Sequence, residues 1–354
     1  MAATYSMLYE AERNLRRNRV FRDRTNPIDS WDDAEFYRRL RFRRSDVLEI
    51  VDDIQEDLVN ANRGRNVAAT SQVCLALSFY ATGAYQNVCA HLVGVTQRTA
   101  GRIIDRVTRA LLDRAHRWIV FPDQPEADRQ KAKFLKLGGF PDVVGCIDGT
   151  HIRIQAPLKH EHEYICRKNF HSINVQVICN ADLLFIDAVA KWPGSVQDAW
   201  VLRQTSIFAA FETHPKPVDG VMLGDSGYMI REWLMTPFLN PSTRHERKYN
   251  AAHTSTRCTV ERAIAAAKRR WHCLRGLRLE PEKACHVIIV CLMLSNKARM
   301  LKLEDPEDQD EEDEDNDYMY NILEDNVPEQ NLATERMRVT AGQAARHRLV
   351  DQFF

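Results

Sequence analysis

Hydrophobic residues recur at helical spacing through the first third of the chain. This spacing predicts a helix over residues 40–54 and three more between residues 71 and 112, with a turn at 94–96 before the last one. Two short helices joined by a glycine-containing turn are typical of a helix-turn-helix. We therefore predict a helix-turn-helix-like all-α domain over residues 61–135, although an ordinary helical subdomain would have the same spacing.

The pattern changes near residue 138 to runs rich in β-branched residues. Strands are predicted at 143–154, 172–179, 183–190 and 221–224, and helical spacing returns at 196–211, 249–270 and 284–300. Adjacent strands followed by a helix, a further strand and more helices predict an α/β layered domain over residues 136–303.

Charge divides the chain into a basic body and an acidic end. Residues 1–303 hold 45 Lys and Arg against 33 Asp and Glu, a balance of +12, whereas residues 304–354 hold 4 against 16, a balance of −12. We predict a basic N-terminal helical region over 1–60, an acidic disordered linker over 304–330 and an amphipathic C-terminal tail over 331–354. The basic body indicates a polyanionic partner such as DNA, and we expect the acidic segment to compete for the same surface.

Composition excludes several classes of protein. Hydrophobic residues make up 44% of the chain, with six Trp, ten Tyr and fourteen Phe, so wholesale disorder is excluded. The longest apolar run, residues 286–294, is about half of what a membrane-spanning helix needs. No secretory signal is visible, and nine cysteines without a CxxC pair favour a reduced intracellular protein.

Three carboxylates lie at sequence positions where ligand-binding sites commonly form. Asp148 interrupts an otherwise apolar strand, Asp225 directly follows the strand at 221–224, and Glu261 lies on a predicted helix rich in Arg and Lys. Carboxylate oxygens of this kind hold the paired Mg²⁺ ions that catalyse phosphodiester cleavage. Metal-dependent phosphoryl chemistry is one interpretation; structural caps and solvated charges are the other.

Basic residues near these regions are candidate DNA contacts. Arg98, Arg102 and Arg106 lie at helical spacing on the last helix of the helix-turn-helix-like domain. The other candidates are Lys168, Lys268, Arg269 and Arg270. His151 and His171 fit a structural role and a role at a phosphate or metal site equally well. The pairs His272-Cys273 and Cys285-His286 match no zinc-finger spacing, so core packing is expected there.

Several motifs in the same order resemble the PIF/Harbinger family of DNA transposases and the nucleases derived from them. They are Gly145-Cys-Ile-Asp148-Gly-Thr-His151-Ile, Arg167-Lys-Asn-Phe-His171-Ser-Ile-Asn174-Val-Gln176, Trp192-Pro-Gly-Ser-Val-Gln-Asp198, Leu223-Gly-Asp225-Ser-Gly-Tyr228 and Val260-Glu261-Arg262. The resemblance covers about residues 71–300. It implies an RNase H-like DDE (transposase/integrase) catalytic domain with the triad Asp148, Asp225 and Glu261. It also implies Mg²⁺ or Mn²⁺ as cofactor, and Asp198 is a candidate fourth acid.

The resemblance further implies a nuclear protein, present also in the cytoplasm, that acts on DNA with a Myb/SANT-like DNA-binding partner. A homo-oligomer is a further expectation, and no membrane association is expected. The chain departs from the family at Ala263-Ile264-Ala265, where Phe-Gly usually follows Val-Glu-Arg, at Asn180 and at Ser295-Asn296. The two function hypotheses are a metal-dependent DNA endonuclease and a domesticated DNA-binding or scaffold protein without cleavage activity. The basic body disfavours a small-molecule phosphohydrolase.

Overall fold

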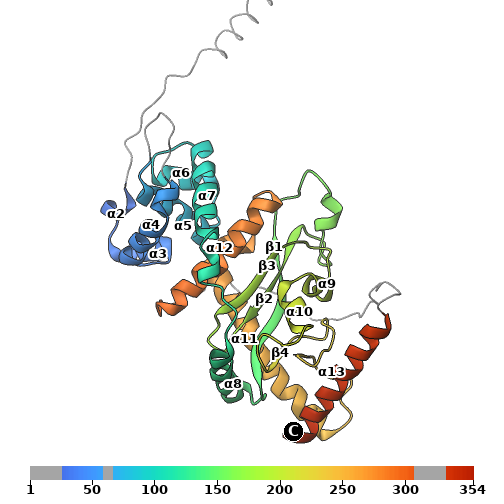
Figure 1. Ribbon diagram of the computed structural model, residues 1–354. Coiled ribbons are helices and arrows are strands. Elements are labelled where there is room, and N and C mark those ends of the chain that lie inside the picture. Colours follow the sequence, from blue (N-terminus) through green and yellow to red (C-terminus); the bar gives the residue numbers. More distant parts are fainter. Residues whose placement is uncertain (1–25, 59–66, 307–331) are drawn as a thin grey trace, which may run out of the picture.

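A five-stranded sheet with helices on both faces lies beside a separate group of helices in the computed structural model, which describes residues 26–58, 67–306 and 332–354 (Figure 1). This arrangement confirms the predicted mixed α/β class. The first 25 residues of the basic N-terminal helical region predicted over 1–60 lie outside the described residues.

In the part of the helical region that the structure describes, there are six helices. They are α2 (Pro27–Ser30), α3 (Asp33–Leu40), α4 (Arg44–Leu58), α5 (Ala69–Thr82), α6 (Gln86–Leu92) and α7 (Gln97–Leu112). Helix α5 is apolar on nearly all sides and is buried among the others, and Gly83 ends it in the left-handed conformation at φ 61°. Thr96 caps α7 by accepting a hydrogen bond from the Thr99 backbone N–H.

The sheet has the strand order β3-β2-β1-β4-β5. Its strands are β1 (Val143–Arg153), β2 (Ser172–Cys179), β3 (Phe185–Pro193), β4 (Val221–Leu223) and β5 (Leu234–Met235). Strand β2 runs antiparallel to both β1 and β3, while β4 is parallel to β1 and β5 is parallel to β4. This topology is consistent with the RNase H-like fold.

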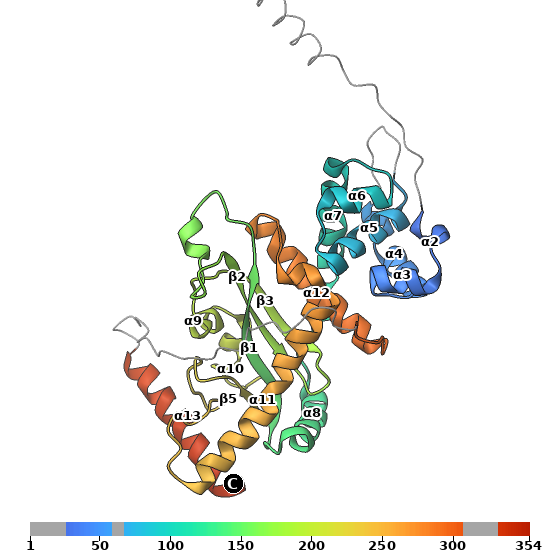
Figure 2. The ribbon, with the colours of Figure 1, turned by 180° about the vertical axis from the view of Figure 1, so that it is seen from behind.

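Different helices cover the two faces of the sheet. Side chains such as Cys146 and Val177 point to the face covered by α11 (Arg244–Arg270) and α12 (Pro281–Met300), which lie in front in Figure 2. Ile147 and Ile178, one position along their strands, belong to the core under α9 (Asp198–Arg203) and α10 (Ser206–Phe211), in front in Figure 1. The remaining elements are η1 (Ala115–Arg117), α8 (Gln124–Gly138), η2 (Glu161–Tyr164), η3 (His272–Arg275) and α13 (Leu332–Phe353).

The helical region and the sheet share one hydrophobic core. The Trp271 ring, at the end of α11, lies 6.4 Å from the ring of Tyr80 on α5 and 5.9 Å from that of Phe42. Helix α8 packs against β1 and α11. It therefore belongs structurally with the sheet, although most of it falls within the helical domain predicted over 61–135.

Local hydrogen bonds account for the elements that differ from the sequence-based boundaries. Strand β3 begins at Phe185 because Asn180 Oδ1 accepts hydrogen bonds from the Asp182 and Leu184 backbone N–H groups and holds a turn there. The helix predicted over 196–211 is divided into α9 and α10, since Thr205 caps α10. A capping box between Thr243 and Glu246 starts α11 five residues earlier than expected.

The C-terminal segment forms α13, which packs against α11 and β5. Buried Arg231 pairs with Glu212 at 3.0 Å and with Glu335 of α13 at 2.5 Å. The Phe354 ring lies 5.6 Å from the rings of Phe140 and Tyr249. Residues 307–331, which hold most of the predicted acidic linker, lie outside the described residues. None of the described helices is both long and apolar enough to cross a membrane.

Candidate active site

Asp148 lies in the middle of β1 and is 4% exposed. Its side chain points to the α11 face of the sheet, as that of Cys146 does two residues earlier. Its Oδ1 atom accepts a hydrogen bond from the Gly149 backbone N–H at 3.0 Å. A carboxylate with so little contact with water requires compensation from neighbouring groups.

Asp225 lies two residues beyond the end of β4 and is 6% exposed. Its Oδ1 atom accepts a hydrogen bond from the Gly227 backbone N–H at 2.8 Å, which fixes the turn that follows the strand. Cys146 pairs with Leu223 in the parallel register of β1 and β4. Asp148 and Asp225 each follow this pair by two residues, so the register brings them to the same level of the sheet.

Glu261 lies on α11, which packs against β1, β2 and β4 on the same face of the sheet. The guanidinium of Arg257, one helical turn earlier, contacts Glu261 Oε1 at 2.5 Å and Asp148 Oδ2 at 3.4 Å. Arg257 therefore joins the helix carboxylate to the strand carboxylate.

Asp198, the first residue of α9, lies on the other face of β1. Its Oδ1 atom accepts a hydrogen bond from the Asn174 amide at 2.8 Å. A β-carbon built on Gly149 would come within 2.5 Å of this carboxylate, so the glycine makes the close approach possible. Burial raises the pKa of Asp198, while the Asn174 hydrogen bond and the Arg167 charge oppose that rise.

The pKa of Asp148 depends on the charges of the other three carboxylates. Burial raises the pKa of Asp148 to about 8, and the Arg257 charge opposes this rise. The charges of Asp225, Asp198 and Glu261 raise it further. The acids predicted from the sequence are therefore brought within electrostatic reach of one another, and the site holds more negative charge than Arg257 balances.

The four acids provide ligand atoms of the type that a hard divalent cation binds. All four acids offer carboxylate oxygens, which Mg²⁺ and Mn²⁺ prefer, and the raised pKa of Asp148 marks a place where added positive charge would stabilise its ionised form. On β2, Gln176 is fully buried next to the site, and neither polar atom of its amide has a hydrogen-bond partner within the described ranges. Among those residues, however, no three His, Cys, Asp or Glu side chains are already gathered closely enough to hold a metal ion.

The predicted DNA contacts are distributed over three places. Arg98 and Arg102 are exposed on α7, and Lys168 is exposed in the connection between β1 and β2. Arg106 is half-buried and donates a hydrogen bond to Gln72 at 3.0 Å. Lys268 and Arg269 are half-buried in the last turn of α11.

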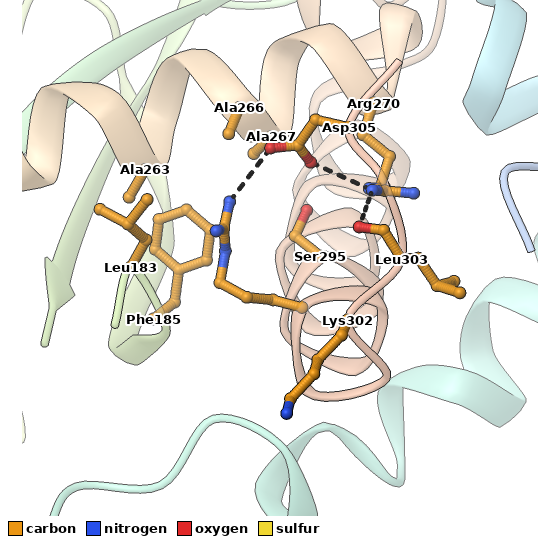
Figure 3. Close-up of a pocket in the computed structure, with 11 residues that line it drawn as sticks. Leu183, Phe185, Ala263, Ala266, Ala267, Arg270, Ser295, Lys302, Leu303 and Asp305 are labelled. Carbon is orange, nitrogen blue, oxygen red and sulfur yellow. Dashed lines mark hydrogen bonds and ion pairs between the residues drawn. The ribbon is translucent and has the colours of Figure 1, made fainter. Parts of the chain in front are cut away.

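Arg270 does not fit the predicted DNA-contact role. It is 3% exposed and donates hydrogen bonds to the carbonyl oxygens of Arg41 and Glu304, and it pairs with Asp305 at 3.0 Å. Figure 3 shows it at the wall of a cavity of about 260 Å³ with Ala263, Ala266 and Ala267 of α11. These positions lie on the side of the helix opposite Glu261, so the cavity is separate from the acidic site.

The histidines and cysteines have structural surroundings. His151 Nδ1 lies 3.0 Å from Ser172 Oγ, and His171 Nε2 lies 3.0 Å from Glu161. Cys273 is buried with its sulfur 3.6 Å from that of Cys291. These contacts agree with the core packing expected for Cys273.

Comparisons with known proteins agree with this geometry. A family model described as DDE superfamily endonuclease matches residues 147–296. The protein "Putative nuclease HARBI1" of Mus musculus is 37% identical over 239 residues, which are 66% of this chain and 68% of the relative. The human protein of that name is 36% identical over the same shares. "Protein ALP1-like" of Arabidopsis thaliana is 28% identical over 66% of this chain and 62% of that relative. No solved structure matches the chain.

The domain that carries Asp148, Asp225 and Glu261 is thus that of a DDE-type endonuclease, and the protein is an enzyme of the nuclease class. More particularly, the chain belongs to the family of Harbinger transposase-derived nucleases. The resemblance inferred from its motifs is confirmed.

Sequence reasoning gave no role to two residues that complete the site. Arg257 contacts two of the predicted catalytic acids, and its position four residues before Glu261 was the signal that could have revealed one of those contacts. Asn174 binds Asp198 from β2. Its amide side chain in a strand rich in β-branched residues was the corresponding signal.

Proposed function

We propose that this protein is a metal-dependent DNA endonuclease in which Asp148, Asp225 and Glu261 hold two divalent cations, Mg²⁺ or Mn²⁺. The observation that carries the proposal is the arrangement of the acids. Asp148 and Asp225 follow paired residues of neighbouring strands by two positions, and Arg257 contacts both Asp148 and Glu261. A cluster of acids that repel one another is costly unless cations offset it. The family membership supplies the reaction class.

The four acids have different roles in the proposed metal site. Asp148 and Asp225 would be shared between the two ions, Glu261 would hold the second, and Asp198 is the candidate fourth acid. Bound divalent ions supply charge neutralisation at the phosphate and lower the pKa of an attacking water. The backbone N–H groups of Gly149 and Gly227 orient the two aspartates by hydrogen bonds to their Oδ1 atoms. The buried sheet and α11 thus hold the acids on rigid elements.

DNA would be bound by the helical region and by the loops beside the acids. Helices α6 and α7, joined by residues 93–96, support a helix-turn-helix-like role, with exposed Arg98 and Arg102 on α7 facing phosphates. Arg106 would contact DNA from its half-buried position, where its side chain also donates a hydrogen bond to Gln72. Lys168, Lys268 and Arg269 would contact the backbone closer to the acids.

The cellular setting is proposed from the family resemblance. It comprises nuclear localisation with some protein in the cytoplasm, a Myb/SANT-like partner that assists targeting, and a homo-oligomer on DNA. The +12 balance of residues 1–303 supports the DNA partner.

Plasmid nicking tests the proposal. Purified protein is incubated with supercoiled DNA in EDTA, Mg²⁺ or Mn²⁺, with and without a Myb-like partner, beside an Asp225→Ala variant. We expect nicking that requires metal and disappears in the variant. Nicking that persists in EDTA or in Asp225→Ala would contradict a metal-dependent centre built on this acid. No nicking under any of these conditions would favour the domesticated DNA-binding protein without cleavage activity.

A further inference from the structure

Arg257 spans the space between two acids on different elements. Its side chain is 12% exposed, and its Nη2 atom lies 2.5 Å from Glu261 Oε1 on the same helix. Its Nη1 atom lies 3.4 Å from Asp148 Oδ2 on β1. One guanidinium therefore bridges the strand and the helix that carry two of the three proposed metal ligands.

This contact differs from an ordinary pair of oppositely charged residues one helical turn apart. Exposed pairs of that kind add only about 0.3–0.5 kcal/mol to stability. Here both carboxylates have limited contact with water, since the side chain of Asp148 is 5% exposed and that of Glu261 is 29% exposed. Charge compensation counts for more in such surroundings.

The same contact engages the oxygens that a metal ion would need. Asp148 Oδ1 accepts the Gly149 N–H and Oδ2 faces Arg257, so both oxygens of the carboxylate already have partners. Glu261 Oε1 is likewise paired with Arg257. A divalent cation bound by both acids would come close to the Arg257 guanidinium, which contacts both of them, and two cations at short distance repel each other.

We propose that Arg257 is the resident counter-cation of the acidic site and that a divalent metal ion exchanges with it. Arg257 thus stabilises the metal-free arrangement of Asp148 and Glu261 and lowers the affinity for metal. It acts as a positioning residue through these two acids. The inference rests on the proposed function, because it takes the acids to be the metal ligands.

Two measurements on the full-length protein test the exchange. The Kd for Mn²⁺ is measured by calorimetry, and the Tm is measured in EDTA and in saturating Mn²⁺. The variants are Arg257→Met, which removes the charge but keeps the stem, and Arg257→Lys, which keeps the charge. Arg262→Met is the matched control, since Arg262 is exposed on the same helix beside Glu261 and its side chain contacts Thr259.

Exchange predicts that Arg257→Met binds Mn²⁺ about tenfold more tightly than wild type, since a nearby positive charge has been removed. Its Tm should fall in EDTA and recover in Mn²⁺, and folding only in Mn²⁺ would support exchange in the same way. Arg257→Lys and Arg262→Met should stay within about threefold of the wild-type Kd.

The contrary outcomes separate this inference from the proposed function. If Arg257→Met binds Mn²⁺ as wild type does and loses the same Tm in EDTA and in Mn²⁺, or fails to fold in both, Arg257 is a structural ion pair and the exchange is wrong. If neither wild type nor Arg257→Met binds Mn²⁺, the proposed metal site itself is wrong, and the exchange falls with it.

Discussion

The side-chain amide of Asn174 on β2 donates hydrogen bonds to Asp198 Oδ1 and to the Val196 carbonyl oxygen, each at 2.8 Å. These bonds tie the start of α9 to the sheet. Asn174 is 1% exposed, so water cannot readily replace it as a donor. The position of Asp198 beside Gly149 therefore depends on a residue from the neighbouring strand.

Replacing Asn174 by Leu should lower the free energy of unfolding by ~1–3 kcal/mol, because a buried carboxylate and a carbonyl lose their donor. Urea denaturation measures the change. Nicking activity should fall as well, since Asp198 is released. The exposed Asn87 on α6 gives a control, Asn87→Ala, that should change neither quantity. Equal stability of the two variants would show that the Asn174 bonds are unimportant.

His253 on α11 predicts a pH dependence of stability. It is 1% exposed, and its Nε2 atom lies 3.1 Å from the Met235 carbonyl oxygen. Burial lowers the pKa of His253 to about 4, and the Arg257 and Arg346 charges lower it further against the Met235 hydrogen bond. The unfolded chain takes up this proton near its ordinary pKa of about 6.5 and the folded chain only near 4. Its stability contribution is thus complete above about pH 6.5 and is lost as the pH falls towards 4.

A His253→Gln variant should lack this part of the pH dependence. From pH 7 to pH 4 the wild type should lose roughly 3 kcal/mol more unfolding free energy than the variant. Urea denaturation at several pH values measures the difference, with exposed His347→Gln as the control. If the unfolding free energy changes with pH in the same way for His253→Gln and wild type, His253 is not a buried neutral histidine.

Gly342 of α13 and Gly101 of α7 provide a test of how the C-terminal helix docks. A β-carbon at Gly342 would lie 2.9 Å from backbone atoms of Arg231, whereas one at Gly101 would meet the flexible end of Gln86. Alanine is normally better in a helix than glycine by ~1 kcal/mol. We expect Gly101→Ala to raise the Tm and Gly342→Ala to lower it, at a cost of ~1–3 kcal/mol from the clash. Thermal unfolding compares them, and a higher Tm for Gly342→Ala would mean that α13 is not packed there.

Arg98 and Arg102 should contribute to DNA affinity without base specificity. Replacing both by Ala should weaken binding to every duplex similarly and should reduce the slope of log affinity against log salt by about 0.9 for each phosphate that the variant no longer neutralises. Fluorescence anisotropy over a salt series measures both. Arg109, also exposed on α7 but paired with Asp105 at 3.2 Å, supplies the control Arg109→Ala. An unchanged slope in the double variant would remove α7 from the DNA interface.

Local sequence signals were sufficient for part of this structure and not for the rest. The β-branched run at 172–179 predicted β2 to the residue, and the turn predicted at 94–96 lies directly before α7, because both depend on neighbouring residues. Strand β5 has two residues and no periodicity, so its formation depends on pairing with β4. Thr205 could cap a helix or lie within one, and only the packing of α10 decides between them.

For the candidate site, too, local sequence signals predicted some features and tertiary contacts determine the others. Asp148 and Asp225 could be found because each stands in or after an apolar strand. Their common level comes from the pairing of Cys146 with Leu223, which is a tertiary contact. The bridge from Arg257 to Asp148 joins residues 109 positions apart. The burial of Arg270, which was predicted as a DNA contact, likewise depends on carbonyls from distant segments.

The most direct measurement of the central claim compares isosteric amide variants of the three acids in the plasmid nicking assay. The variants are Asp148→Asn, Asp225→Asn and Glu261→Gln, and the control is Asp187→Asn, a half-buried aspartate on β3. Each site variant should remain folded and lose roughly 100-fold or more of the Mn²⁺-dependent nicking rate, while the control retains it. Site variants that nick DNA as fast as Asp187→Asn would contradict a nuclease centre built on these acids.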